Sequence, residues 1–197
     1  MPRAKPRRRT VVLAATACAG VLAVVLAVTA FSGGGTATGV SYLAGNTNAV
    51  YYQPGHRHVA PDFSGTTLTG QALRFASYRG RVVVLNFWGS WCVPCRTEAA
   101  TLTVAANQYQ RSGVEFLGVD IQDNVASAAA FARGHAVPYP SVSDPNDLVP
   151  LAFGSAVPIA ATPTTLVVDA SGHIAGAVFG EVTYSELSTL LGKVAAR

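Results

Sequence analysis

A mostly apolar run that ends just before two closely spaced cysteines constrains the fold of this chain more than any other feature. Val82–Trp88 contains three adjacent valines, which is the pattern of a strand buried on both faces of a sheet. Gly89-Ser90-Trp91 then leads into Cys92-Val93-Pro94-Cys95. The two cysteines therefore stand where a buried strand passes into the next element.

The segment that begins at the cysteines predicts a helix, because its apolar residues recur three and four positions apart and line one face. These residues are Ala99, Leu102, Ala106 and Tyr109. Gly113 can end the helix, and Val114–Ile121 predicts a second buried strand. Strand, helix and strand in this order form a parallel unit with a right-handed crossover.

Further segments extend this unit into an α/β domain. Thr66–Leu68 and Ala72–Phe75 predict a short N-terminal hairpin, and Pro138–Pro163 contains six prolines and little periodicity. The remaining predicted elements are an Ala-rich helix at Val125–Gly134, strands at Thr164–Asp169 and His173–Phe179, and a closing amphipathic helix at Ser185–Ala195. We expect a central mixed sheet, parallel at its centre and antiparallel at one edge, with helices on both faces.

The first 31 residues predict a membrane anchor or an export signal. Thr10–Phe31 carries no charge and is mostly Val, Ala and Leu, which is long enough to cross a hydrocarbon core of about 30 Å as a helix. The basic residues before it keep the N-terminus in the cytoplasm by the positive-inside rule. We therefore expect a single-pass transmembrane helix, with the rest of the chain outside the cell membrane.

Three other interpretations of this segment also export the rest of the chain. Val28-Thr29-Ala30 resembles a signal-peptidase site, and cleavage near Ala30 would give a secreted protein. Cys18 would be the lipid attachment site of a lipoprotein signal, although the apolar core continues past it. Arg8-Arg9 resembles a twin-arginine signal. The expected compartment is the same in every case.

The residues after the apolar segment are nearly neutral overall. Five of the 14 basic residues precede Thr10 and no acidic residue precedes Asp62, which leaves 9 basic and 10 acidic residues. This balance does not indicate a nucleic-acid partner. Residues 32–60 are rich in Gly, Ser, Thr and Asn and predict a flexible linker, so we expect the folded domain at residues 61–197. His56 and His58 are expected to be loop residues and not metal ligands.

The cysteine pair predicts thiol-disulfide exchange. A helix N-terminus presents unpaired N–H groups and a partial positive charge, which stabilise a thiolate and lower the pKa of a cysteine. Two cysteines three positions apart on a first helical turn are near enough to form a disulfide, and we expect Cys92 to be the more exposed. Cys92 is therefore the expected attacking thiolate and Cys95 the expected resolving thiol.

Two other uses of a C-x-x-C pair fit the sequence less well. A structural zinc site needs four ligands, and the chain has no second C-x-x-C and no H-x-x-x-H. A purely structural disulfide across so short a loop adds little stability, and it needs neither a strand-to-helix junction nor the flanking Trp91. We expect no metal and no other cofactor.

Residues 82–98 resemble the thioredoxin superfamily, and specifically its exported TlpA/ResA-like (DsbE/CcmG-like) branch of thiol-disulfide oxidoreductases. Pro61-Asp62-Phe63 with Gly70 and Leu73 is similar to the N-terminal hairpin of that branch. Its later proline strand and hairpin are similar to two stretches of this chain, Thr162-Pro163-Thr164-Thr165 and Val168-Asp169-Ala170-Ser171-Gly172. The similarity covers about residue 60 to the C-terminus and implies a thioredoxin-like fold and redox chemistry.

The resemblance also implies a substrate site around the cysteines. Pro163 is implied to be a cis-proline that faces them, with Thr162 beside it offering backbone atoms to an extended client segment. We expect Trp91, Val93 and Pro94, which flank the cysteines, to contact the client as well.

Three positions distinguish this chain within the resemblance. Asn86 stands where thioredoxin has a buried Asp that helps to move protons, which an amide cannot do. Glu98, one helical turn after Cys95, matches an acidic position of ResA-like proteins; it is either the acceptor of the Cys95 proton or a carboxylate that only complements the helix dipole. Gly154–Ala161 looks longer than the loop expected before the cis-proline, which alters the expected substrate groove.

These features together predict an extracytoplasmic thiol-disulfide oxidoreductase. In the reductive direction it attacks a disulfide of an exported client, for example apocytochrome c before haem attachment, and a membrane electron-transfer partner regenerates it. In the oxidative direction it donates a disulfide to folding clients, and the sequence leaves the direction open. The other hypotheses are a thiol peroxidase, because Pro61-Asp62-Phe63 also occurs in peroxiredoxin-like chains, and a chaperone module that binds clients without turnover.

Overall fold

The computed structural model describes residues 39–43 and 48–195 of the chain. The predicted anchor or signal at residues 1–31 lies outside the described residues. No helix within the described ranges combines the length and the apolar character needed to cross a membrane.

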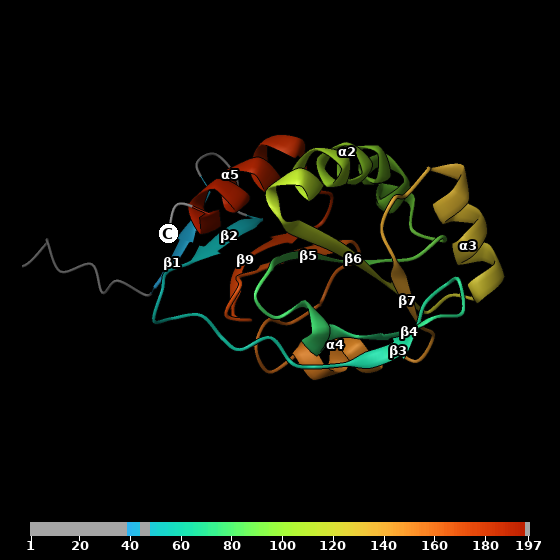
Figure 1. Ribbon diagram of the computed structural model, residues 1–197, viewed down its shortest axis with the longest axis horizontal. Coiled ribbons are helices and arrows are strands. Elements are labelled where there is room, and N and C mark those ends of the chain that lie inside the picture. The colour runs from blue at the N-terminus through green and yellow to red at the C-terminus, as the bar shows by residue number, and fades with distance from the viewer. Residues whose placement is uncertain (1–38, 44–47, 196–197) are drawn as a thin grey trace, which may run out of the picture. The chain divides into compact units, whose positions relative to one another are not determined.

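A seven-stranded mixed sheet forms the centre of the domain, in the order β1-β2-β9-β8-β5-β6-β7 (Figure 1). β5, β6 and β7 are parallel, whereas every pairing from β5 through β8, β9 and β2 to β1 is antiparallel. β3 and β4 form a separate hairpin. The strands are β1 Val40–Tyr42, β2 Ala49–Tyr52, β3 Ser64–Thr66, β4 Ala72–Arg74, β5 Val82–Trp88, β6 Val114–Ile121, β7 Ser141–Asp144, β8 Thr164–Val168 and β9 Ile174–Phe179.

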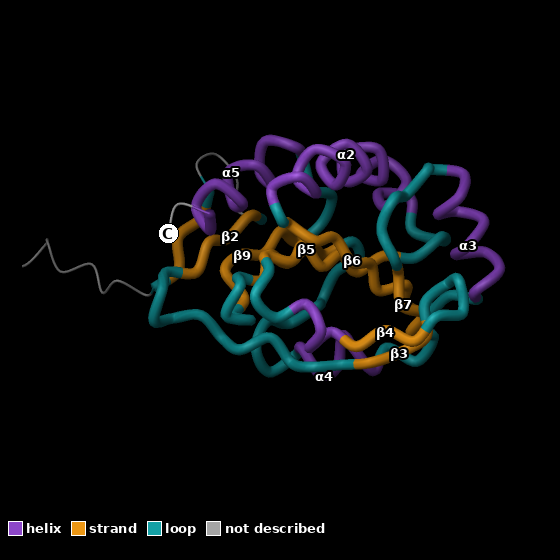
Figure 2. The backbone as a smooth tube through the Cα atoms, viewed as in Figure 1, coloured by secondary structure: helices purple, strands orange, loops and turns teal. Residues whose placement is uncertain are grey.

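Helices cover both faces of this sheet (Figure 2). α2 and α5 lie on one face, α3 lies near the β7 edge, and α4 lies on the other face beside the β3–β4 hairpin. The helices are α2 Val93–Tyr109, α3 Val125–Gly134, α4 Leu148–Phe153 and α5 Tyr184–Ala195, with 3-10 turns η1 Phe75–Tyr78 and η2 Gln110–Ser112. The expected arrangement of a mixed sheet between helices is confirmed.

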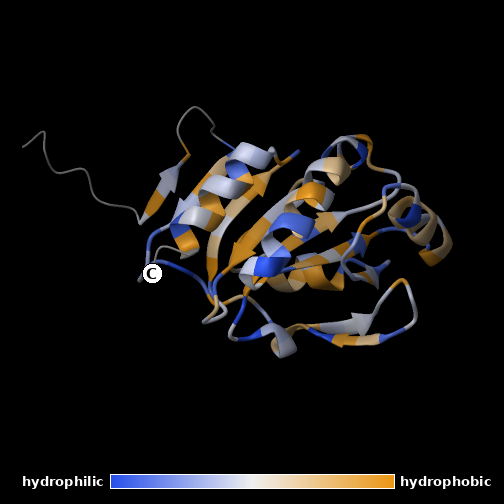
Figure 3. Cartoon of the chain, turned by 45° about the horizontal axis from the view of Figure 1, so that its top comes forward, coloured by the Kyte–Doolittle hydropathy of each residue, from blue (hydrophilic) through white to orange (hydrophobic). Residues whose placement is uncertain are grey.

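Apolar side chains form a core on each face of the sheet, and Figure 3 shows the apolar strands between the helices. On one face, Val84 of β5 belongs to a buried cluster with Leu102 of α2 and Leu190 of α5. On the other face, the ring of Phe87 meets that of Phe153 of α4 edge to face, with centroids 5.6 Å apart. Because β5 is covered on both faces, its sequence is almost continuously apolar.

Most predicted elements match the structure closely. β5, β6 and α3 have the predicted bounds, and β8, β9 and α5 differ from the prediction by one residue at one end. The predicted N-terminal hairpin exists, but its first strand, β3, begins two residues earlier than expected.

The prediction of a flexible linker at residues 32–60 was wrong for part of that range. β1 and β2 both lie within it and extend the central sheet, with Tyr51 of β2 paired to Gly176 of β9. Tyr51 is buried, since it is 5% exposed. The folded domain therefore begins before the predicted boundary at Pro61.

The sheet is parallel at its centre and antiparallel at the β1 edge, as expected, and its parallel part also extends to the other edge through a strand that was not predicted. β7 and α4 both form within the proline-rich segment Pro138–Pro163, where no regular element was predicted. Ser141 of β7 pairs with Gly118 of β6 in a parallel ladder. The parallel half of the sheet consequently reaches one edge.

Candidate active site

Cys92 and Cys95 form a disulfide at the junction of β5 and α2, with their Cα atoms 5.3 Å apart. Cys92 is the N-cap residue of α2, and its Sγ accepts a hydrogen bond from the backbone N–H of Cys95 at 3.2 Å. Pro94 lies in the first turn, where a missing N–H removes no helical hydrogen bond. The sulfur of Cys92 is thus at the positive end of the helix dipole, which favours a thiolate.

The two cysteines are almost equally buried in this disulfide form. Cys92 is 3% exposed and Cys95 is 2% exposed, so the expectation that Cys92 would be the more exposed was wrong here. Cys92 is covered because it belongs to a buried cluster with Trp88. The side chains next to it in sequence are different, since Trp91 is 48% exposed and Val93 is 70% exposed.

The loop that precedes the disulfide is fixed by residues at the end of β6. The indole Nε1 of Trp91 donates a hydrogen bond to the carbonyl of Ile121 at 3.1 Å, and the backbone N–H of Ser90 donates to Oδ2 of Asp123 at 2.7 Å. Gly89 is required at this close approach, because a Cβ atom there would lie 2.4 Å from the Trp91 indole nitrogen. The loop is therefore anchored to the strand that runs parallel to β5.

The peptide bond between Thr162 and Pro163 is cis, which confirms the expectation from the resemblance. Thr164, the first residue of β8, pairs with Phe87 of β5. Pro163 therefore lies at the end of the sheet where β5 passes into the disulfide loop. Pro163 is buried, and its carbonyl accepts a hydrogen bond from the N–H of Gly180 at 2.8 Å.

Glu98 is buried one helical turn after Cys95, with 1% of the residue exposed. Its Oε1 accepts a hydrogen bond from the side-chain amide of Asn86 at 2.9 Å, and its Oε2 accepts one from the N–H of Val182 at 3.0 Å. Burial raises the pKa of Glu98 from 4.5 to about 7; the two hydrogen bonds oppose this shift, and the charge of Glu181 adds to it. This carboxyl group can therefore exchange a proton near neutral pH.

Glu98 and Cys95 line the same small cavity, together with Asn86, Trp88 and Tyr139. The volume of this cavity is about 10 Å³, which is room for about one water molecule. Burial, followed by the charge of Glu98, raises the pKa of Tyr139. Glu98 is therefore a buried carboxyl group beside Cys95 and does not lie on the solvent face of its helix.

Two carboxyl groups beside the disulfide loop were missed by the sequence reasoning. Asp120 of β6 pairs with Trp88 and is fully buried, and neither of its carboxyl oxygens has a hydrogen-bond partner within the described part of the chain. Burial, followed by the charge of Asp123, raises the pKa of Asp120 to about 8. Two acidic residues three positions apart at the end of a buried strand were the available signal.

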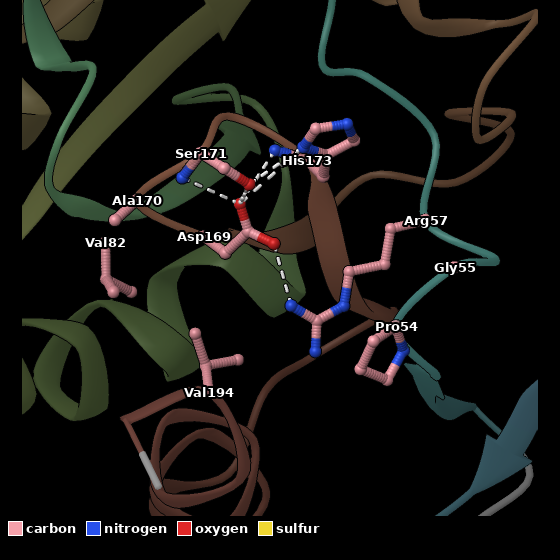
Figure 4. A pocket seen from close by; sticks show the side chains of 9 residues that line it. All are labelled: Pro54, Gly55, Arg57, Val82, Asp169, Ala170, Ser171, His173 and Val194. Atoms are coloured by element: carbon pink, nitrogen blue, oxygen red, sulfur yellow. Dashed lines mark hydrogen bonds and ion pairs between the residues drawn. The ribbon is translucent and has the colours of Figure 1, made fainter. Parts of the chain in front are cut away.

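A larger cavity, of about 660 Å³, lies at the opposite end of the sheet (Figure 4). There Arg57 pairs with Asp169 at 2.7 Å, and the same carboxylate accepts hydrogen bonds from the Ser171 hydroxyl and the His173 N–H. Burial raises the pKa of Asp169, but the bonds from Ser171, His173 and Arg57 outweigh it, and the pKa is lowered. The charge and the hydrogen-bonding capacity of Asp169 are thus matched by these neighbours. The contacts join the β8–β9 hairpin to the segment after β2, so their role is structural.

Known proteins with related sequences perform thiol chemistry. The AhpC/TSA family matches residues 57–177. The thiol-disulfide oxidoreductase ResA of Geobacillus thermodenitrificans is 33% identical over 135 residues, which are 68% of this chain and 75% of that protein.

Two solved structures share the fold. A DsbF homologue from Corynebacterium diphtheriae is 28% identical, with a TM-score of 0.69 over 78% of this chain and 97% of that chain. A secreted thiol-disulfide isomerase from Corynebacterium glutamicum is 27% identical, with a TM-score of 0.71 over 80% of this chain and 97% of that chain. The expected thioredoxin-like fold is thereby confirmed.

Proposed function

The chain belongs to the AhpC/TSA family and is a thiol-disulfide oxidoreductase of the ResA type, and from this membership we propose that it exchanges disulfides with exported protein clients. The observation that carries the proposal is the position of Cys92, which caps α2 and is disulfide-bonded to Cys95. A thiolate at this position is stabilised by the helix dipole and by the amide of Cys95, so Cys92 is the attacking sulfur.

The exchange consists of two substitutions at sulfur. In the reductive direction, the Cys92 thiolate attacks one sulfur of the client disulfide, which forms a mixed disulfide and releases the other client sulfur as a thiolate. The Cys95 thiolate then attacks Sγ of Cys92, which closes the enzyme disulfide and releases the second client thiolate. Two electrons pass from the enzyme dithiol to the client, and the oxidative direction is the reverse of these steps.

Glu98 accepts the proton that Cys95 must lose before the second step. The cavity that these two residues share and the pKa of about 7 for Glu98 both support this role. Asn86 is a positioning residue, because its amide holds Oε1 of Glu98 but carries no exchangeable charge.

The client-binding surface surrounds the disulfide. The exposure of Trp91 and Val93 supports their contact with a client, as does the location of Thr162 beside the end of β5. Pro94, which is exposed in the first turn of α2, also belongs to this surface, and the buried Pro163 supports it from below as the cis-proline next to Thr162.

We assign the reductive direction to this pair, with apocytochrome c as the client and a membrane electron-transfer partner as the source of electrons. The resemblance of residues 82–98 to the exported TlpA/ResA-like branch is the ground for this assignment. The predicted anchor at residues 1–31 would hold the domain outside the cell membrane, where exported clients are found. The reduction potential of the pair, measured against glutathione, tests the direction: a value near thioredoxin's ~−270 mV supports a reductase, and one near DsbA's ~−120 mV supports a disulfide donor.

Insulin reduction by the purified protein tests the exchange itself. We expect Cys92→Ser to abolish it, and Cys95→Ser to accumulate a mixed disulfide with the client because the second step is lost. If both variants reduce insulin as fast as the parent protein, the proposed mechanism is refuted. Peroxide consumption that depends on Cys92 at physiological peroxide concentrations would favour a thiol peroxidase instead.

A further inference from the structure

The proton that Cys95 gives to Glu98 needs a route out of the protein. Glu98 is 1% exposed, and it must lose this proton before it can act again. Its oxygens accept hydrogen bonds from the amide of Asn86 and the N–H of Val182, and neither donor can take up a proton. During the second step the client covers the surface around the disulfide. The proton therefore leaves through another wall of the cavity that Glu98 shares with Cys95.

Tyr139 is part of the wall of that cavity. Its hydroxyl is close to Glu98, since the charge of Glu98 adds to burial in raising the pKa of Tyr139. The hydroxyl forms no hydrogen bond with any residue in the described ranges, so it can bond to a water molecule in the cavity. A hydroxyl donates one proton and accepts another. Because its pKa is raised, Tyr139 stays neutral and can pass a proton on without becoming a phenolate.

Contacts with β6 hold Tyr139 in place. Its ring lies against the ring of Phe116, with centroids 5.8 Å apart. The chain next to it is fixed as well, because the carbonyl of Pro140 accepts a hydrogen bond from the N–H of Gly118 at 2.9 Å. The hydroxyl is therefore held at the cavity and does not depend on a mobile side chain.

An open pocket of about 400 Å³ lies on the outer side of Tyr139, between α3 and the tip of the β3–β4 hairpin, and we call it the Arg133 pocket. Val137 and Tyr139 line both this pocket and the buried cavity. Val137 is apolar, so Tyr139 is the polar group that the two spaces share. The lining of the Arg133 pocket includes Leu68, Thr69, Ala132, Arg133, Val137 and Tyr139.

The Arg133 pocket stays open to water when a client is bound. None of the residues assigned to the client surface lines it. Arg133 is permanently charged and cannot accept a proton, so the acceptor at this end is water. Tyr139 also lines a smaller pocket of about 100 Å³ beside Glu115. That pocket shares a single lining residue with the buried cavity, whereas the Arg133 pocket shares two.

We propose that Tyr139 relays the proton of Glu98 to water in the Arg133 pocket. The inference rests on the proposed exchange function and adds the exit of the proton to it. The carboxyl group of Glu98 gives its proton to a water molecule in the cavity, and this water gives a proton to the oxygen of Tyr139. The hydroxyl proton of Tyr139 passes to water in the pocket. Glu98 is again a carboxylate, Tyr139 is again neutral, and no electrons move.

The test follows the proton and the leaving groups separately. The full-length reduced protein is mixed in a stopped-flow instrument with dithiobis-nitrobenzoate at pH 8, in weak buffer with a fluorescent pH indicator. Attack by Cys92 releases the first thionitrobenzoate, and attack by Cys95 releases the second. Both leave as thiolates, so the proton that appears is that of Cys95. In the parent protein we expect this proton to appear in water together with the second thionitrobenzoate.

Tyr139→Phe keeps the ring and removes the hydroxyl. The second thionitrobenzoate should be released at the rate of the parent, because Glu98 is ionised at pH 8 and accepts the proton as before. The appearance of the proton in water should be delayed by roughly 10²-fold, which is at the low end of the contribution of a positioned proton-transfer group. Tyr78→Phe is the matched control, because Tyr78 is also half-buried but lines neither the cavity nor the pocket.

A second variant closes the exit and leaves the hydroxyl in place. Ala132→Trp fills the Arg133 pocket from α3 and should delay the proton in the same way. Ala130→Trp is its matched control, since Ala130 is an exposed residue of the same helix that does not line the pocket. Urea unfolding verifies that each variant is folded.

The two signals separate the two proposals. If the parent protein releases no thionitrobenzoate, the proposed function fails. If it does, and the proton keeps pace with the second thionitrobenzoate in Tyr139→Phe, the relay is overturned. A second thionitrobenzoate that slows as much as the proton would assign Tyr139 to the exchange step and also overturn the relay. A delay in Tyr139→Phe but not in Ala132→Trp would place the exit outside the Arg133 pocket and overturn the proposed route.

Discussion

The side-chain amide of Asn86 donates a hydrogen bond to Oε1 of Glu98 at 2.9 Å, and this contact joins the central strand to the helix that carries the disulfide. Asn86 also donates to Oγ1 of Thr165 at 3.1 Å, so its orientation is fixed from β8 as well. Glu98 is therefore held by β5 through Asn86, whose side chain is oriented in turn by β8. The amide of Asn86 is a hydrogen-bond donor that does not titrate. Glu98 is therefore the member of this hydrogen-bonded pair that can gain or lose a proton.

Glu98→Gln should slow the release of the second client thiol by roughly 10²-fold, which is the usual effect of losing a general base. The pKa of Glu98 is about 7, so in the parent protein the ionised form increases, and the second step accelerates, as the pH rises through 7. Single-turnover release of the client thiol between pH 5 and 9 measures this step.

The variant should lack the inflection near pH 7. Glu181→Gln provides a matched control, since it removes a negative charge that raises the pKa of Glu98 and should move the inflection to lower pH without abolishing it. An inflection near pH 7 that persists in Glu98→Gln would assign it to another group.

Asp120→Asn should stabilise the protein at alkaline pH. Since the pKa of Asp120 is raised from 3.8 to about 8, the unfolded chain loses this proton at a lower pH than the folded one. The contribution of Asp120 to stability is thus fully present below pH 4 and is lost as the pH rises toward 8. The free energy of unfolding of the variant should exceed that of the parent by on the order of 2–5 kcal/mol at pH 8.5 and by much less at pH 4.

Urea unfolding at both pH values measures this difference. A constant difference between variant and parent across the pH range would show that Asp120 does not titrate between the folded and unfolded states in this window.

Arg57→Met should destabilise the protein without slowing exchange. The pair of Arg57 with Asp169 is buried, with side chains 7% and 13% exposed, and removal of one partner leaves an uncompensated charge at a cost of about 3–5 kcal/mol. Arg81→Met is the matched control, because the pair of Arg81 with Glu115 is 42% and 36% exposed and should contribute less than about 1 kcal/mol.

Urea unfolding compares the two variants, and dithiobis-nitrobenzoate exchange below the transition checks their activity. Because both pairs lie away from the disulfide, exchange rates equal to that of the parent are expected. A slow Arg57→Met variant that is fully folded would place this cluster in the redox mechanism.

The parts of the fold that could be predicted are those whose sequence pattern is set locally. Val82–Trp88 and Val114–Ile121 are covered on both faces, so each is a nearly continuous apolar run with clear ends. The position of Cys92 and Cys95 at a strand-to-helix junction could be predicted for a similar reason, because an apolar run ends just before them and a helical pattern begins at them.

The parts that could not be predicted depend on distant partners. β2 has only four residues in a Gly- and Asn-rich region, and it is a strand because β9 offers an open edge to it. α4 contains Pro150, which usually argues against a helix, but this proline lies in the first turn, where its missing N–H is harmless. Asp120 was overlooked because its importance comes from burial beside Trp88, which no local pattern reveals.

The most direct test of the account is the pH dependence of alkylation of Cys92 and Cys95 in the reduced protein, followed by mass spectrometry of each residue. A sulfur at the N-cap of α2 should ionise well below the ordinary thiol value of about 8.5, so Cys92 should react with iodoacetamide at neutral pH much faster than Cys95. If both cysteines react at the same rate with midpoints near 8.5, the dipole-stabilised thiolate does not exist, and the central claim is contradicted.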